Sequence, residues 1–170
     1  MIITGYKLIE ALKMKKLEIE SLQSQYEDSL YAFPDDEKLK PQDIISDISR
    51  LEIQVSLLQT AQCYYNVAVE FDGTNGKRMH LENAINLVGA ISRQSHMWKI
   101  AAKGEKRSQY SSPQLSRSSE EIVAKPTIDK KQALQGAKQS EQMISQLRSL
   151  IALANNTQLE ISFIDESLLN

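Results

Sequence analysis

The sequence predicts an all-α protein built as an antiparallel bundle of about four long helices, with a coiled-coil-like helical hairpin within it. Between Pro41 and Phe71, apolar residues recur alternately four and three residues apart, as on one face of a long helix. The composition agrees, because 6% aromatic residues, Gly 6 and Pro 4 favour helix over sheet. At 170 residues the chain suits a single domain, 1–170, with one core. We call the regularly spaced residues the heptad seam; they are Ile44, Ile48, Leu51, Val55, Leu58, Gln62, Tyr65 and Val69.

The heptad seam is consistent with two kinds of packing. With Val55 at position a and Leu58 at position d, it has β-branched residues at a and leucine at d. In a parallel pair this combination favours a dimeric coiled coil, in which Gln62 sets the register. A wider apolar face favours instead a bundle core within one chain, where Gln62 bonds a neighbouring polar group. The residues that widen the face are Ala61 and Ala68 at g and Ile45 at e. Both kinds of packing remain open, and one does not exclude the other.

The boundaries of the first two helices follow from proline and glycine. Pro34 cannot continue a helix and ends the first, whereas Pro41 suits the first position of the second. Gly73 and Gly76 belong to a turn that stops the second helix. We therefore predict helices at 7–32 and 41–71. The first carries the same spacing through Leu8, Leu12, Ile19, Leu22, Tyr26 and Phe33, with Lys15 and Ser29 at the missing steps.

The third and fourth helices are marked by an apolar stripe and by capping residues. Thr127 or Asp129 can cap the fourth helix, and Asn155-Asn156 ends it. The stripe of the third slips by one residue near Ile91, which suggests bundle packing. We predict these helices at 79–102 and 129–154. The inward candidates of the third are Leu81, Ile85, Val88, Ile91, Trp98 and Ala102, with Ser95 on the same stripe.

Residues 103–119 differ in character from the helices. They hold six serines and few apolar residues, and four basic residues against Glu105 give a local charge of +3. We expect a flexible connection here. Residues 121–124 are suited to a short extended segment, and a small strand in the tail 159–170 that pairs with them is one arrangement open to the chain.

The histidines and the cysteine do not form a recognisable reactive site. His80 and His96 are sixteen residues apart on the third predicted helix, which places them about 160° apart around its axis. The spacings of zinc and di-iron ligands, such as HExxH and CxxC, are missing. Cys63 is the single cysteine, so no intrachain disulfide is possible, and we expect a small buried hydrophobe. We therefore predict no metal and no cofactor.

Acidic groups are the other candidates for a metal site, here one for magnesium. Glu18 and Glu20 are two residues apart and point to different sides of one helix. Glu70, Asp72 and Asp35-Asp36-Glu37 lie at predicted helix ends or in a loop. We expect solvated or capping roles for all of them.

Four short stretches occur in the order and approximate spacing of one protein family. The most specific is Glu121-Ile122, followed after four residues by Thr127-Ile128-Asp129. The others are Lys7-Leu8-Ile9-Glu10-Ala11-Leu12, Asn66 followed by Asp72-Gly73, and Asn155-Asn156-Thr157. Over residues 7–161 the chain thus resembles the septicolysin-like family of small all-helical bacterial proteins, although Asn83-Ala84-Ile85 replaces the charged run expected on the third helix. The resemblance implies an all-helical fold and brings no established activity.

These observations favour a non-catalytic interaction or scaffolding protein that forms a homo-oligomer through its long helices. The alternatives are an enzyme with an unrecognised site and a membrane-active protein, as the family name suggests. A net charge of −2 gives no reason to expect nucleic acid, and the serine-rich loop is a weak basis for it. The opening residues lack a secretory pattern, and no apolar run is long enough for a membrane span. We therefore expect a cytoplasmic protein.

Overall fold

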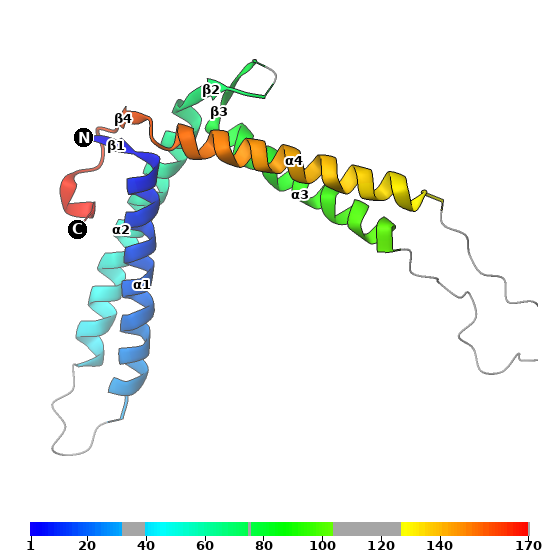
Figure 1. The fold of residues 1–170 in the computed structure, drawn as a ribbon. Helices are drawn as coiled ribbons and strands as arrows, with labels where there is room; N and C mark the ends of the chain where they lie inside the picture. The colour runs from blue at the N-terminus through cyan, green and yellow to red at the C-terminus, as the bar shows by residue number, and fades with distance from the viewer. Residues whose placement is uncertain (32–39, 75, 104–126, 170) are drawn as a thin grey trace, which may run out of the picture. The chain divides into compact units, whose positions relative to one another are not determined.

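The computed structural model describes residues 1–31, 40–74, 76–103 and 127–169, and it is mostly helical with two small antiparallel strand pairs (Figure 1). The helices are α1 (Gly5–Ser29), α2 (Pro41–Ala68), α3 (Leu81–Lys103) and α4 (Lys130–Ala154). The other elements are β1 (Ile2–Thr4), β2 (Glu70–Asp72), β3 (Arg78–His80), β4 (Gln158–Glu160) and the 3-10 helix η1 (Glu166–Leu169). The predominance of helix is confirmed. The loop predicted at 103–119 lies outside the described residues, apart from Lys103 at the end of α3.

The elements form two compact units, and each is described by itself. The first unit comprises Met1–Ala84 and Leu150–Asn170, and the second comprises Ile85–Ser149. The first therefore holds α1, α2 and all four strands, and the second holds most of α3 and α4. A single domain in which all four helices share one core stays a prediction.

The helices α1 and α2 pack side by side as an antiparallel hairpin, with the heptad seam between them (Figure 1). Leu58 and Tyr65 are fully buried, and Ile48 and Gln62 are half-buried. The buried seam residues are Ile44, Leu51, Val55, Leu58, Tyr65 and Val69, and those of α1 are Leu8, Ala11, Leu12, Lys15 and Ile19. The seam thus forms the core of this hairpin, and its use between chains stays a prediction.

The helix predicted at 7–32 begins earlier and ends earlier than expected. Thr4 caps α1 with its side-chain oxygen, which accepts a backbone N–H of the first turn. At the other end the Ser29 hydroxyl donates to the Tyr26 carbonyl at 2.7 Å, a local bond that competes with continued helix. Pro34, which was expected to end this helix, lies outside the described residues.

The helix predicted at 41–71 ends at Ala68, because the next residues form β2 of a β-hairpin. The backbone N–H of Gly73 donates to the carbonyl of Lys77 at 2.8 Å. Gly76 has a φ of 67°, in the left-handed region that favours glycine. The predicted turn is confirmed, whereas the strands that flank it were not predicted.

The strand β4 in the C-terminal tail pairs antiparallel with β1, with Leu159 opposite Ile3. A tail strand therefore exists and pairs with β1, and residues 121–124, the partner expected from the sequence, lie outside the described residues. β-Branched residues in β1 suit this pairing. Beyond the strand, the tail packs into the core of the first unit through Ile161, Ile164 and Leu168.

The helices α3 and α4 lie side by side and antiparallel, and they approach closely where small residues occur (Figure 1). Gly136 lies against the ring of Trp98, and Lys99 Nζ is 2.6 Å from Glu141 Oε1. Asp129 caps α4, as predicted, through Oδ2, which accepts two backbone N–H groups at 3.0 and 3.3 Å. The buried residues of α4 within this unit are Ala133, Ala137, Ser140 and Leu147.

The stripe of α3 differs from the prediction at its first turn. The helix begins at Leu81 and not at residue 79, because Met79 and His80 belong to β3. Ala84 is fully buried, whereas Ile85 is 41% exposed. The one-residue slip predicted in the apolar stripe near Ile91 is wrong. It arose because Ile85, the larger side chain, was assigned to the stripe in place of Ala84. The regular stripe is Ala84, Val88, Ile91, Ser95, Trp98 and Ala102.

Gly136→Ala should destabilise the second unit, although alanine normally favours a helix by about 1 kcal/mol. The added Cβ would lie 2.7 Å from Trp98 Cδ2, so the ring would have to move. We expect a net loss of about 1–2 kcal/mol and a change in the fluorescence of Trp98, the single tryptophan. Gly89→Ala in α3 is the matched control, because its Cβ would be an ordinary 3.6 Å from Arg93. If Gly136→Ala raised the melting temperature as Gly89→Ala should, the close approach would be wrong.

Candidate functional site

One end of the α1–α2 hairpin is held by the buried hydroxyl of Tyr65. The hydroxyl lies 2.7 Å from the Thr157 carbonyl and 3.0 Å from the Ala154 carbonyl, and it donates to them. These carbonyls lie at and just beyond the end of α4, and the Ala154 carbonyl also accepts the backbone N–H of Thr157 at 3.0 Å. Tyr65 therefore joins the last turns of α2 to the chain that leads into β4.

The first turn of α1 packs against the same tyrosine at Gly5. A Cβ on Gly5 would lie 2.6 Å from Tyr65 Cε1 and would also collide with the Asn155 side chain. The backbone N–H of Tyr6 donates to the Asn155 carbonyl at 3.3 Å. A side chain on Gly5 would not fit, and this is why α1 starts with glycine. This cluster fixes where α1 and α2 begin and end relative to each other.

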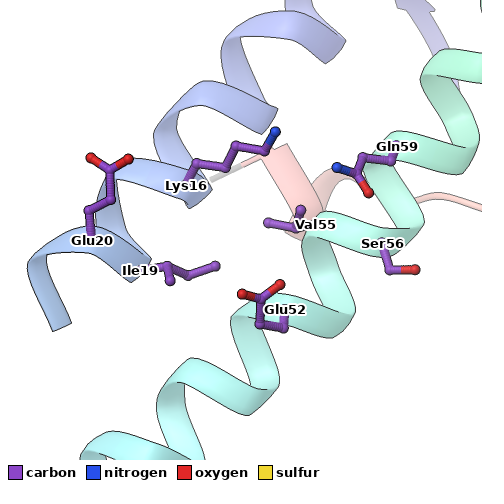
Figure 2. A pocket seen from close by; sticks show the side chains of 7 residues that line it. All are labelled: Lys16, Ile19, Glu20, Glu52, Val55, Ser56 and Gln59. Carbon is purple, nitrogen blue, oxygen red and sulfur yellow. The ribbon is translucent and has the colours of Figure 1, made fainter. Parts of the chain in front are cut away.

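A groove runs along one side of the hairpin, and it is the candidate functional site. It has a volume of about 290 Å³ and lies between α1 and α2 (Figure 2). Ile19 and Val55 form an apolar floor between the helices, and polar side chains surround it. Its lining residues are Lys16, Ile19, Glu20, Glu52, Val55, Ser56 and Gln59.

A second hollow of about 380 Å³ continues this surface along α1 and shares Lys16 and Glu20 with the groove. Its lining includes Leu12, the half-exposed Ile9 and the half-buried Gln62. Gln62, the polar member of the heptad seam, therefore borders an open hollow. The sequence had suggested that Gln62 would lie in an enclosed bundle core and bond a neighbouring polar group there. In the structure it lies at the edge of an open hollow instead.

The groove carries charges of both signs. Figure 2 shows Lys16 reaching from α1 toward α2, the carboxylate of Glu52 between the helices, and Glu20 pointing away from α2. Lys16 and Glu52 both have long side chains that keep their charged ends in water above the apolar floor. Within the described part of the chain, no ion pair joins Lys16 to Glu52 or to Glu20. Such an arrangement suits contact with another charged surface.

The groove was not predicted, because the only e position considered was Ile45, as part of a wider apolar face. Lys16 follows Ile9 by seven residues, and Gln59 follows Glu52 by seven, so each pair shares one helix face. These are e positions, beside the seam. The polar residues at e could have shown that one side of the hairpin stays open.

Cys63 and His80 do not occupy the predicted environments, whereas His96 lies on α3 as predicted. Cys63 is exposed, because it lies two residues from both Ala61 and Tyr65 and so faces away from the core. His80 ends β3, not a helix, and its Nε2 is 3.4 Å from Glu70 Oε1. In the part of the chain that the structure describes, no three His, Cys, Asp or Glu side chains are grouped as metal ligands would be.

Among the described helices, none is both long enough and apolar enough to cross a membrane.

Comparison with known proteins shows that another protein of known structure has a similar fold. No family model matches this chain, and no curated protein matches it. The structure is similar to the crystal structure of a functionally unknown conserved protein from Corynebacterium diphtheriae, with 20% sequence identity and a TM-score of 0.71. The match covers 94% of this chain and 100% of that chain. At this identity the likeness supports a shared fold and carries no function.

Tyr65→Phe should lower the free energy of unfolding by about 1 kcal/mol, because the hydrogen bonds of the Tyr65 hydroxyl to the Ala154 and Thr157 carbonyls are lost while the ring keeps its packing. Urea unfolding followed by circular dichroism measures this loss. Tyr64→Phe is the matched control, because Tyr64 is exposed and meets Phe163 only through its ring, at a centroid distance of 6.0 Å. We expect a change below about 0.5 kcal/mol for the control. Equal effects of the two variants would contradict the role of the Tyr65 hydroxyl.

Alkaline pH should destabilise the wild type more than Tyr65→Phe. Burial raises the pKa of Tyr65 above its ordinary value of 10.0, and a hydrogen bond from the Gly5 backbone partly opposes this. The unfolded chain therefore ionises this phenol first. The stabilisation is fully present below pH 10 and is lost as the pH rises through 10 toward the raised pKa. Urea midpoints measured across this range should converge for the two proteins, and a constant difference would contradict the raised pKa.

Proposed function

We propose that this protein is a non-catalytic helical interaction protein that associates with itself through its long helices. The groove on the α1–α2 hairpin is the observation that carries this proposal. Its floor of Ile19 and Val55 is apolar, and its rim of Lys16, Glu52 and Gln59 is polar. An apolar centre with a polar rim is the usual anatomy of a protein–protein interface.

The other predictions from the sequence form part of the same proposal. The bundle in which the four helices of one chain share a core is among these predictions. Membership of the septicolysin-like family and a cytoplasmic location also stay predictions, and nucleic acid is not an expected partner.

Self-association should be visible as a concentration-dependent molar mass. We expect multi-angle light scattering to report a mass above the 19.2 kDa of one chain at micromolar concentrations. Because charged groups surround the groove, raising the salt concentration should weaken the association. A monodisperse monomer over the whole concentration range would contradict the proposal.

A further inference from the structure

We propose that the outer face of α2 pairs with the same face of a second copy of this chain, as a short antiparallel coiled coil. The residues of this face are spaced alternately four and three apart. We call them the outer stripe; they are Ile53, Leu57, Thr60, Tyr64 and Val67. This inference rests on the self-association proposed above and gives it a contact surface that is separate from the groove.

The outer stripe lies on the side of α2 that faces away from α1. Each of its residues comes two positions after a residue of the heptad seam, as Ile53 comes after Leu51. Two positions correspond to about 200° around a helix, so a second helix can approach the outer stripe without meeting α1. The large side chains of the stripe are exposed within one chain. Their exposed fractions are 65% for Ile53, 40% for Leu57, 49% for Tyr64 and 51% for Val67.

The composition of this stretch is typical of the centre of an interface. From Ile53 to Val69 the chain carries no lysine, arginine, aspartate or glutamate, whereas α1 carries many charged residues over a similar length. Depletion of charge and enrichment of aromatic side chains mark the central part of protein–protein interfaces. The exposed ring of Tyr64 meets the ring of Phe163 edge-on, at a centroid distance of 6.0 Å, and Phe163 is also exposed. The C-terminal tail therefore adds an aromatic ring beside the outer stripe.

A second copy of α2 fits this face when it runs antiparallel. An uncharged face needs an uncharged partner, because burying an unpaired charge against it would be costly. A two-fold axis that crosses α2 midway between Leu57 and Thr60 brings these two residues of opposite copies together, and it brings Ile53 of each copy to Tyr64 of the other. The Thr60 hydroxyl donates to the Ser56 carbonyl at 3.0 Å, so it needs no acceptor in the second copy.

The charge next to the outer stripe favours the antiparallel direction over the parallel one. Arg50 continues the stripe toward the start of α2, three residues before Ile53. In a parallel pair Arg50 of one copy would face Arg50 of the other, and like charges in contact are costly. In the antiparallel pair Arg50 lies at the level of Val67 of the second copy. Its ion pair with Asp47 in the same helix, at 3.0 Å, is kept there.

The length of the outer stripe suits a weak and reversible dimer. From Ile53 to Val67 it spans about 21 Å. A contact of this length along one helix belongs to the small interfaces, below about 1,200 Å² in total, where association is transient. We therefore expect a dimer that forms at micromolar and higher concentrations.

Sedimentation equilibrium of the full-length chain at high salt tests the outer stripe apart from the groove. In about 1 M NaCl the Debye length is about 3 Å, which weakens contacts between exposed charges such as those of the groove rim. Apolar contacts persist, so we expect a dimer under these conditions. A chain that associates at low salt and is monomeric at high salt would overturn this inference and leave the proposed function standing.

Ile53→Glu and Tyr64→Lys test the antiparallel pairing under the same conditions. Each single variant places an unpaired charge against an apolar side chain in two symmetry-related layers, so it should weaken the dimer at least about tenfold. An equimolar mixture of the two variants pairs the new charges with each other in one layer and leaves the other layer as in the wild type. The double variant pairs them in both layers. Both should regain the dimer, because salt screens partly buried ion pairs much less than exposed ones.

Met14→Glu and Tyr6→Lys on α1 are the matched controls, because both residues are exposed and neither belongs to the outer stripe. They should leave the dimer unchanged, and circular dichroism checks the helical content of every variant. A dimer that persists in both single variants of the outer stripe would overturn this surface. Single variants that dissociate the dimer without rescue in the mixture or in the double variant would overturn the antiparallel pairing.

Discussion

The buried hydroxyl of Tyr65 is the contact on which the order of the first unit depends. It reaches carbonyls 89 and 92 residues away in the sequence, at the end of α4 and in the turn that follows. That turn leads directly into β4, which pairs with β1, and Thr4 at the end of β1 caps α1. Gly5 then brings α1 back against the Tyr65 ring. These contacts run from α2 through the end of α4, β4 and β1 to α1, and from α1 back to α2. They fix the register of the two long helices at this end of the hairpin.

With the register fixed at one end, the two sides of the seam receive different neighbours. The C-terminal tail joins the core through Ile161, Ile164 and Leu168, together with Ala11 and Ala61 at g positions of the two helices. Small residues at g let the tail approach closely. On the other side, e positions carry Lys16, Glu52 and Gln59, which are long and polar, and this side is the groove. The difference between the two sides therefore follows from side-chain size and polarity at e and g.

Much of this arrangement could be predicted from the sequence, because helical periodicity is a local signal. The spacing of the heptad seam, the cap at Asp129 and the turn at Gly73 all depend on residues a few positions apart. The strands β1, β2 and β3 were missed because three residues are too few to show a period, and their stability comes from pairing with another strand. Tyr65 fitted the seam as an apolar residue, and nothing local shows where its hydroxyl points. The groove was missed for a related reason, because residues at e have meaning only once the register is known.

The polar side of the hairpin also explains how such a groove can exist in an unpartnered chain. Lysine, glutamate and glutamine keep their ends in water, so exposing this face costs little when no partner is present. Covering the apolar floor gives a modest gain, and the charges then decide which surface is accepted, because a like-charged surface is repelled. A face of this kind favours a reversible and selective contact over a permanent one.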